Sequence, residues 1–313
     1  MKVLLVMLVG FLSTYSQIAS AHLKWFAVDG PAIDLGEYYA SYTYEIALGL
    51  VLCAVMLGVA VWLNRYWVVD FQPTPVMKKY VLRAFSILIG LSLLFASYSE
   101  SIIAVHYIVS NRVLVLLQYA QAIVGFMLVF NLFPRIAASF LIAIYIVLAT
   151  QFGVLEVLDY MNFIGIALFL VLLHSDDETQ QAMATPTIRI ITGVTLVVLA
   201  CSEKLLNPSL GLQFLAVNDW NFMHTLGVTG FSNELFILSA GFVELLIGLV
   251  FILGLLTRIN TLVLVGFMVT SNITFMIQSD YGDAVTELAG HMPVLAIALV
   301  LLMSGAGNKW AVR

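Results

Sequence analysis

Long apolar stretches alternate with short polar turns along most of this chain. Most stretches hold about 17–22 residues, which is enough for a helix to cross a hydrocarbon layer of about 30 Å. Such segments must be helical, because lipid offers no partners for open backbone groups. We therefore predict an all-α polytopic membrane bundle with nine spans, at residues 45–64, 80–99, 113–132, 136–153, 160–174, 188–206, 235–256, 260–277 and 288–304.

Polar residues and glycines recur inside these stretches with matched spacing, which predicts an internal duplication. The matched pairs are Gly90 and Gly193, Ser99 and Ser202, Glu100 and Glu203, Gln121 and Glu244, Gly125 and Gly248, Arg135 and Arg258, and Glu156 and Glu287. The duplicated unit is four spans, at residues 80–175 and again at residues 188–304. Because four is even, both copies start on the same side and are parallel repeats.

The first residues have the features of a secretory signal. Lys2 precedes an apolar run from Val3 to Leu12, and Ala19-Ser20-Ala21 is a small-x-small cleavage site. We expect cleavage before His22; the alternative is an uncleaved additional span.

Basic residues predict the orientation. With the mature N-terminus outside, nine lysines and arginines lie on the cytoplasmic side and three lie outside, as the positive-inside rule requires. The chain is then a multi-pass protein of a bacterial-type plasma (inner) membrane with a cytoplasmic C-terminus. The expected segments are a signal peptide (1–21), an external segment, first span and cytoplasmic linker (22–79), the first repeat (80–175), a cytoplasmic linker (176–187), the second repeat (188–304) and a cytoplasmic tail (305–313).

Composition supports a membrane protein and excludes several functions. The chain is 62% hydrophobic and 10% charged, which a soluble domain of this size does not accommodate. A net charge of -5 gives no sign of the basic surface that nucleic-acid binding requires. Cys53 and Cys201 stand in separate apolar segments, so neither a disulfide framework nor a CxxC pair is expected. The chain has no P-loop, dinucleotide fingerprint, GxSxG elbow or CxxCH haem site.

Ionisable residues inside the apolar segments of the second repeat are the candidate site. A carboxylate at membrane depth must pair, protonate or face water, so we expect these groups to line one polar pocket in the external half. Glu287 and His291 are four residues apart and share a helical face. The candidates are Glu203, Lys204, Glu244, Glu287 and His291.

Glu244 also belongs to a stripe of small residues with Ala240 and Gly248, where a neighbouring helix can approach closely. The first repeat has Gln121 in place of Glu244 and Tyr160 in place of His291, which favours an active site in the second repeat. Structural alternatives stay open: the glutamates tie helices together, His291 is a helix cap, and Lys204 extends to the interface.

We predict no metal site from spacing, since neither HxxxH nor HExxH occurs. The one metal alternative is copper at a mature N-terminal His22, through its amine and imidazole. Arg135 and Arg258, which follow apolar spans, are expected to be topology anchors near helix C-termini.

Residues 188–302 resemble the DoxX family of four-helix membrane proteins. The resemblance rests on Ser202-Glu203-Lys204-Leu205, on Glu244 and Gly248 running to Arg258, and on Glu287-Leu288-Ala289-Gly290-His291. The first repeat looks like a degenerate second copy. The resemblance implies a redox-associated membrane role, as in the large subunit of a thiosulfate:quinone oxidoreductase, and names no substrate.

Three functions stay open. The first is a quinone-interacting redox subunit in which Glu244 accepts a proton and a partner subunit supplies or receives electrons. The second is a non-catalytic scaffold or assembly factor for a partner oxidoreductase, with residues 207–234 as a re-entrant or surface loop that docks it. The third is a transporter, which the absence of obvious mid-membrane breaks disfavours.

Overall fold

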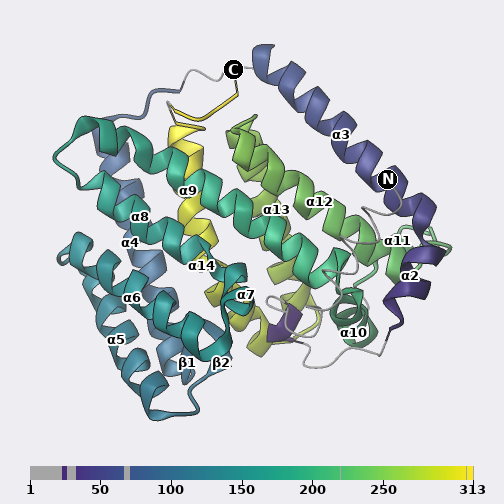
Figure 1. The fold of residues 1–313 in the computed structure, drawn as a ribbon, viewed down its shortest axis with the longest axis horizontal. Helices are drawn as coiled ribbons and strands as arrows, with labels where there is room; N and C mark the ends of the chain where they lie inside the picture. Colours follow the sequence, from purple (N-terminus) through teal and green to yellow (C-terminus); the bar gives the residue numbers. More distant parts are fainter. Residues whose placement is uncertain (1–22, 27–32, 67–70, 219, 308, 313) are drawn as a thin grey trace. The chain divides into compact units, whose positions relative to one another are not determined.

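The computed structural model describes residues 23–26, 33–66, 71–218, 220–307 and 309–312, so the predicted signal peptide and His22 lie outside the described residues. Its elements, drawn in Figure 1, are η1 (Leu23–Trp25), α2 (Leu35–Ser41), α3 (Thr43–Tyr66), α4 (Pro75–Tyr98), β1 (Ser101–Ile102), β2 (Ala104–Ile108), α5 (Arg112–Val129), α6 (Pro134–Phe152), α7 (Val154–Val157), η2 (Leu158–Tyr160), α8 (Asn162–Leu173), α9 (Glu178–Leu199), η3 (Ala200–Leu205), α10 (Pro208–Asn218), α11 (Phe222–Thr225), α12 (Asn233–Leu253), α13 (Thr257–Ile277) and α14 (Tyr281–Ser304).

The predicted all-α membrane bundle is confirmed. Within the described residues, eight helices are long and apolar enough to cross a membrane. A ninth span results if α7, η2 and α8 are taken together, although this segment bends by 62°. Membrane-spanning helices contact the lipid bilayer directly.

Three details lie outside the sequence-based expectation. The segment before α8 bends by 62°, and α9 ends in a π-helical turn at η3. The expectation that the spans lack mid-membrane breaks stays a prediction. Helix α9 begins at Glu178, inside the segment expected to be a linker, and contains Pro186. The chain also forms an antiparallel hairpin, β1–β2, between α4 and α5, and β1 contacts both helices (Figure 1).

The chain divides into two compact units. The smaller unit comprises the residues up to Gly58 together with Leu196–Leu246, and the larger unit comprises Val59–Thr195 together with Ile247–Arg313. Helices α3, α9 and α12 therefore contribute residues to both units.

In the larger unit, two helix pairs approach each other in the same way. A Cβ atom at Gly90 of α4 would lie 2.6 Å from the Gly125 carbonyl oxygen and 2.7 Å from the Val129 side chain. A Cβ atom at Gly193 of α9 would lie 2.6 Å from the Gly248 carbonyl oxygen and 2.8 Å from the Ile252 side chain. Glycine at these positions lets the backbones of the paired helices touch.

Two further contacts in the larger unit join segments of the two predicted repeats. Helix α4 packs on α14, where the Ser92 hydroxyl donates to the Ala289 carbonyl at 3.0 Å. Helix α8 meets α9, where a Cβ at Gly165 would lie 3.0 Å from Ile191. The first helix of each predicted repeat thus meets the last helix of the other. Such reciprocity is what a duplication would produce, and the duplication itself stays a prediction.

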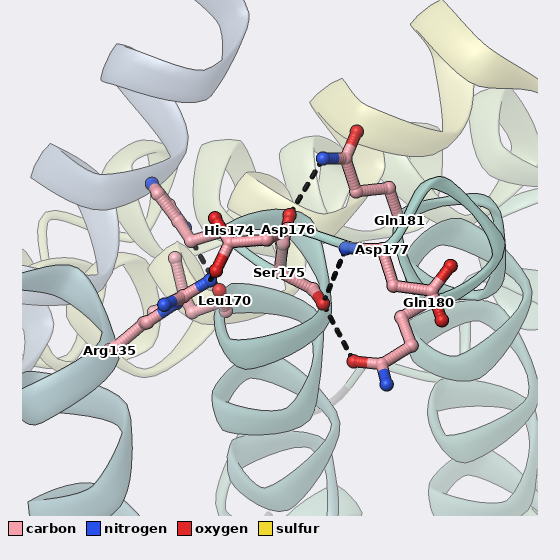
Figure 2. Close-up of polar contacts among 8 residues, drawn as sticks. All are labelled: Arg135, Leu170, His174, Ser175, Asp176, Asp177, Gln180 and Gln181. Carbon is pink, nitrogen blue, oxygen red and sulfur yellow. Dashed lines mark hydrogen bonds and ion pairs between the residues drawn. The ribbon is translucent and has the colours of Figure 1, made fainter.

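The segment between the two predicted repeats is a short polar turn (Figure 2). His174 Nδ1 lies 2.9 Å from the Leu170 carbonyl oxygen, and the Gln181 side chain donates to the Ser175 carbonyl at 2.7 Å. Arg135 Nη2 lies 3.6 Å from Asp176 Oδ2. Both groups of that ion pair are exposed, so it contributes little to stability.

Arg135 and Arg258 are the second residues of helices α6 and α13, so each lies in the first turn of the helix that follows the expected apolar span. Their role as topology anchors stays a prediction. The Arg258 side chain nevertheless reaches a helix C-terminus. It donates to the Leu302 and Met303 carbonyls of α14 at 2.9 and 3.0 Å. A guanidinium suits this position, because the last carbonyls of a helix have no partner within the helix and carry partial negative charge.

Candidate acidic site

Glu203 and Lys204 lie on the π-helical turn Ala200–Leu205, directly after α9. A π-turn holds one more residue than an α-turn and commonly occurs at functional sites. Such a turn changes the direction of successive side chains. Within it, Lys204 contacts both its sequence neighbour Glu203 and Glu244 of α12.

The three charged groups form a compact cluster in the smaller unit. Lys204 Nζ lies 2.8 Å from Glu244 Oε2 and 3.5 Å from Glu203 Oε2. The side chains of Lys204, Glu203 and Glu244 are 17%, 0% and 21% exposed. Burial makes an isolated carboxylate unfavourable, and the ammonium between the two glutamates offsets that cost.

Gly241 permits this approach, and sequence reasoning missed it. A Cβ atom at Gly241 of α12 would lie 2.7 Å from the Leu205 side chain and 3.1 Å from Lys204 Cβ. Gly241 precedes Glu244 by three residues and therefore shares its helical face. The stripe of small residues around Glu244 indicated a close helix approach, and Gly241 extends that stripe.

Two residues near the start of the chain also contact the π-turn and were not predicted. The Tyr39 hydroxyl donates to the Leu205 carbonyl at 3.0 Å, and the Leu23 amide donates to Glu203 Oε1 at 3.3 Å. Burial raises the pKa of Tyr39 to about 12, so its hydroxyl stays protonated and remains a donor at neutral pH. No local motif marks contacts between residues this far apart in sequence.

Glu287 and His291 lie together in the larger unit. His291 Nδ1 is 3.5 Å from Glu287 Oε1, as their spacing of four residues predicts. Ser271 of α13 donates to the same Glu287 oxygen at 2.7 Å. Sequence reasoning missed Ser271, although the polar pair Ser271-Asn272 inside an apolar span was a usable signal.

The structure therefore brings Glu203, Lys204 and Glu244 together, and separately brings Glu287 and His291 together. A single pocket formed by all five stays a prediction. Among the described residues, no group of three or more His, Cys, Asp or Glu side chains is arranged to hold a metal ion. The copper alternative at His22 concerns a residue outside the described part of the chain.

Gln121, the first-repeat counterpart of Glu244, has a different environment. Its Oε1 accepts from the Ile103 amide at 2.6 Å, and its Nε2 donates to the Leu93 and Ser101 carbonyls. These bonds fix strand β1 and the turn at Ile103 between β1 and β2. A neutral amide fits here because it both donates and accepts.

The first repeat also contains a carboxylate that sequence reasoning missed. Asp159 of η2 is buried, and it lies near Tyr107 and Tyr145. The Tyr107 hydroxyl donates to the Glu156 carbonyl at 2.9 Å. Burial raises the pKa of Tyr107 above its usual value, and Asp159 raises it further. Both predicted repeats thus contain buried carboxylate side chains.

Comparison with known protein families gives one match, within the segment that holds the acidic cluster. Residues 184–277 match the DoxX family model. The chain is a multi-pass membrane protein, and this part of it is similar to the DoxX family. The match contains Glu203, Lys204, Glu244 and Ser271, but ends before Glu287 and His291. No curated protein and no solved structure matches the chain.

Proposed function

We propose that this DoxX-like protein is the membrane subunit of a quinone-linked redox system, and that the cluster of Glu203, Lys204 and Glu244 exchanges protons. The observation that carries the proposal is one ammonium shared by two carboxylates inside a membrane-spanning domain. Intramembrane ionisable groups are costly, and they mark substrate and ion pathways and proton relays in membrane proteins.

The geometry supports distinct roles for the two glutamates. Glu244 is partly exposed and can exchange a proton, while Glu203 is fully buried and holds the Lys204 ammonium in place. Reduction of a quinone consumes two electrons and two protons, and oxidation of a quinol releases them. The chain would supply the proton path, and a partner subunit would supply or receive the electrons. The basic residues favour a mature N-terminus outside and a cytoplasmic C-terminus.

A quinone titration tests this proposal. The purified protein in mild detergent is titrated with a ubiquinone analogue, and the affinity of wild type is compared with that of Glu244→Gln. This substitution copies the residue of the first repeat and removes the charge with little change in size. We expect Glu244→Gln to bind about tenfold more weakly, because a hydrogen bond involving an ionised group is lost.

Glu178→Gln, at an exposed position, is the matched control and should bind as wild type does. Equal affinity in wild type and Glu244→Gln, or no binding by either, would contradict the proposal. If Glu244→Gln also left the phenotype intact while changes within residues 207–234 abolished partner capture, the scaffold function would be favoured instead. That segment contains helix α10, whose Gly211 packs against Ile237.

A second candidate, an ion-coupled transporter, is favoured by the bent span that contains α7 and α8. The 62° bend before α8 breaks one candidate span, and discontinuous helices of this kind form substrate sites in transporters. Proton flux into vesicles in the absence of any quinone would support it. A flux equal to that of empty vesicles would count against it.

A further inference from the structure

Tyr38 is a buried tyrosine whose hydroxyl has no hydrogen-bond partner among the described residues. It lies in α2 of the smaller unit and is 6% exposed. A buried donor without an acceptor is unfavourable, and such groups are few in native proteins. The hydroxyl of the next residue, Tyr39, is by contrast bonded to the Leu205 carbonyl at 3.0 Å. The unpaired donor therefore needs an explanation specific to Tyr38.

Aromatic rings line the surroundings of Tyr38. The ring of Tyr42 lies 5.0 Å from its ring, and the ring of Tyr39 lies 5.6 Å from it. A flat apolar ring that carries a carbonyl group suits these surroundings, because it packs on aromatic side chains and accepts the one available bond. A buried water needs two to four polar partners, so it would have to bridge the hydroxyl to Glu234, the nearby carboxylate of α12.

The hydroxyl of Tyr38 is a donor at neutral pH. Burial raises the pKa of Tyr38 above its usual value, and the neighbouring Tyr42 and Tyr39 raise it further. The group therefore keeps its proton and offers it to an acceptor rather than accepting one itself.

Tyr38 also belongs to the packed region that holds the acidic cluster. Its neighbour Tyr39 bonds to the π-turn that carries Lys204. Cys201 of the same turn lies near both Tyr39 and Glu244. These contacts all lie within the smaller unit.

We propose that the Tyr38 hydroxyl donates a hydrogen bond to a carbonyl oxygen of a bound quinone, whose ring packs against Tyr42. The inference rests on the redox function proposed above, and it adds a residue that holds the head group to the carboxylate that exchanges protons. Tyr39 and Tyr42 are half-buried. The quinone therefore reaches the hydroxyl when one of these side chains changes rotamer, as commonly happens on binding.

Removal of the hydroxyl tests this inference. Tyr38→Phe keeps the ring and deletes only the oxygen, and Tyr44→Phe is the matched control because Tyr44 is 86% exposed. Wild type and variants in mild detergent are titrated with a ubiquinone analogue, and their thermal unfolding is measured without it. Infrared difference spectra record the carbonyl stretching band of the bound analogue.

We expect Tyr38→Phe to bind the analogue about fivefold more weakly, because one neutral hydrogen bond is lost. The carbonyl band should move to higher wavenumber, because a hydrogen bond weakens the carbonyl bond. Without the analogue, the unfolding midpoint of Tyr38→Phe should equal or exceed that of wild type. Tyr39→Phe should lower this midpoint, since it loses the bond to Leu205. Tyr44→Phe should match wild type in every measurement.

Wild-type affinity and an unshifted carbonyl band in Tyr38→Phe would overturn the inference alone, if Glu244→Gln still binds the analogue weakly. No binding by wild type would overturn both this inference and the proposed function. A midpoint for Tyr38→Phe as low as that of Tyr39→Phe, or failure of Tyr38→Phe to fold, would show that the hydroxyl supports the fold, as a water bridge to Glu234 would make it do. That outcome also overturns the inference.

Discussion

Residue by residue, the unusual feature of this protein is Lys204. Its ammonium lies 2.8 Å from one glutamate oxygen and 3.5 Å from another, with only 17% of its side chain exposed. A cation in this position stabilises both carboxylates at once. Removing it leaves two negative charges close together in a site with little water, and such uncompensated charge is strongly destabilising.

Lys204→Met should therefore lower the free energy of unfolding by about 3 kcal/mol. Glu244→Met made together with Lys204→Met should cost less than the sum of the two single changes, with a coupling energy on the order of 2 kcal/mol. Thermal unfolding in detergent measures both effects. Lys79→Met removes an exposed lysine and should change the midpoint little. Additivity of the two single changes would show that the ion pair contributes nothing.

At the scale of elements, glycines decide which helices touch. Gly90 faces the Gly125 backbone, and Gly193 faces the Gly248 backbone in the same manner. The atoms that oppose Gly193 belong to main chain, and a main chain inside a helix does not move aside as a flexible side chain does. An added methyl group would therefore force α9 and α12 apart, because a well-packed interface resists extra volume.

We expect Gly193→Ala to destabilise the protein by about 1–3 kcal/mol. Gly266→Ala is its matched control in α13: a Cβ atom there meets nothing within 4 Å, so the higher helix propensity of alanine should leave stability equal or higher by up to about 1 kcal/mol. Midpoints of thermal unfolding compare the two variants. A Gly193→Ala variant as stable as Gly266→Ala would mean that the close approach is not needed.

Considering the chain as a whole, its C-terminal segment is part of the fold. The Arg189 guanidinium in the larger unit is fully buried, and it donates to the carbonyls of Phe251, Ile252, Ala306 and Trp310. The first two belong to the last turns of α12, and the other two belong to the tail. The Val312 amide also donates to the Leu253 carbonyl at 2.9 Å. The tail predicted at residues 305–313 thus supplies acceptors for a buried cation.

Deleting residues 306–313 should destabilise the protein by about 3 kcal/mol, because Arg189 loses two of its carbonyl acceptors. Trp310→Ala is the control, since it keeps the backbone carbonyl and removes only a side chain that is largely exposed. Thermal unfolding in detergent compares the two. Equal midpoints for the deletion and Trp310→Ala would show that these backbone bonds do not stabilise the fold.

The amino-acid sequence by itself determined the class of protein and the number of apolar segments. Hydrophobic length alone decides whether a segment can cross a bilayer, and lipid forces such a segment to be helical. It also identified Glu203, Lys204 and Glu244 as candidates, because charge inside an apolar run is conspicuous. The spacing of Glu287 and His291 predicted their contact, since the helical period is local.

Tertiary structure decided which groups meet. Only the π-turn and the close approach at Gly241 bring Lys204 between two glutamates, and only long-range packing brings the Leu23 amide to Glu203. Neither the bend before α8 nor the carbonyl acceptors of Arg189 could be predicted from the sequence. A pattern along one chain records the period of each helix, whereas the distance between helices depends on contacts among residues far apart in sequence.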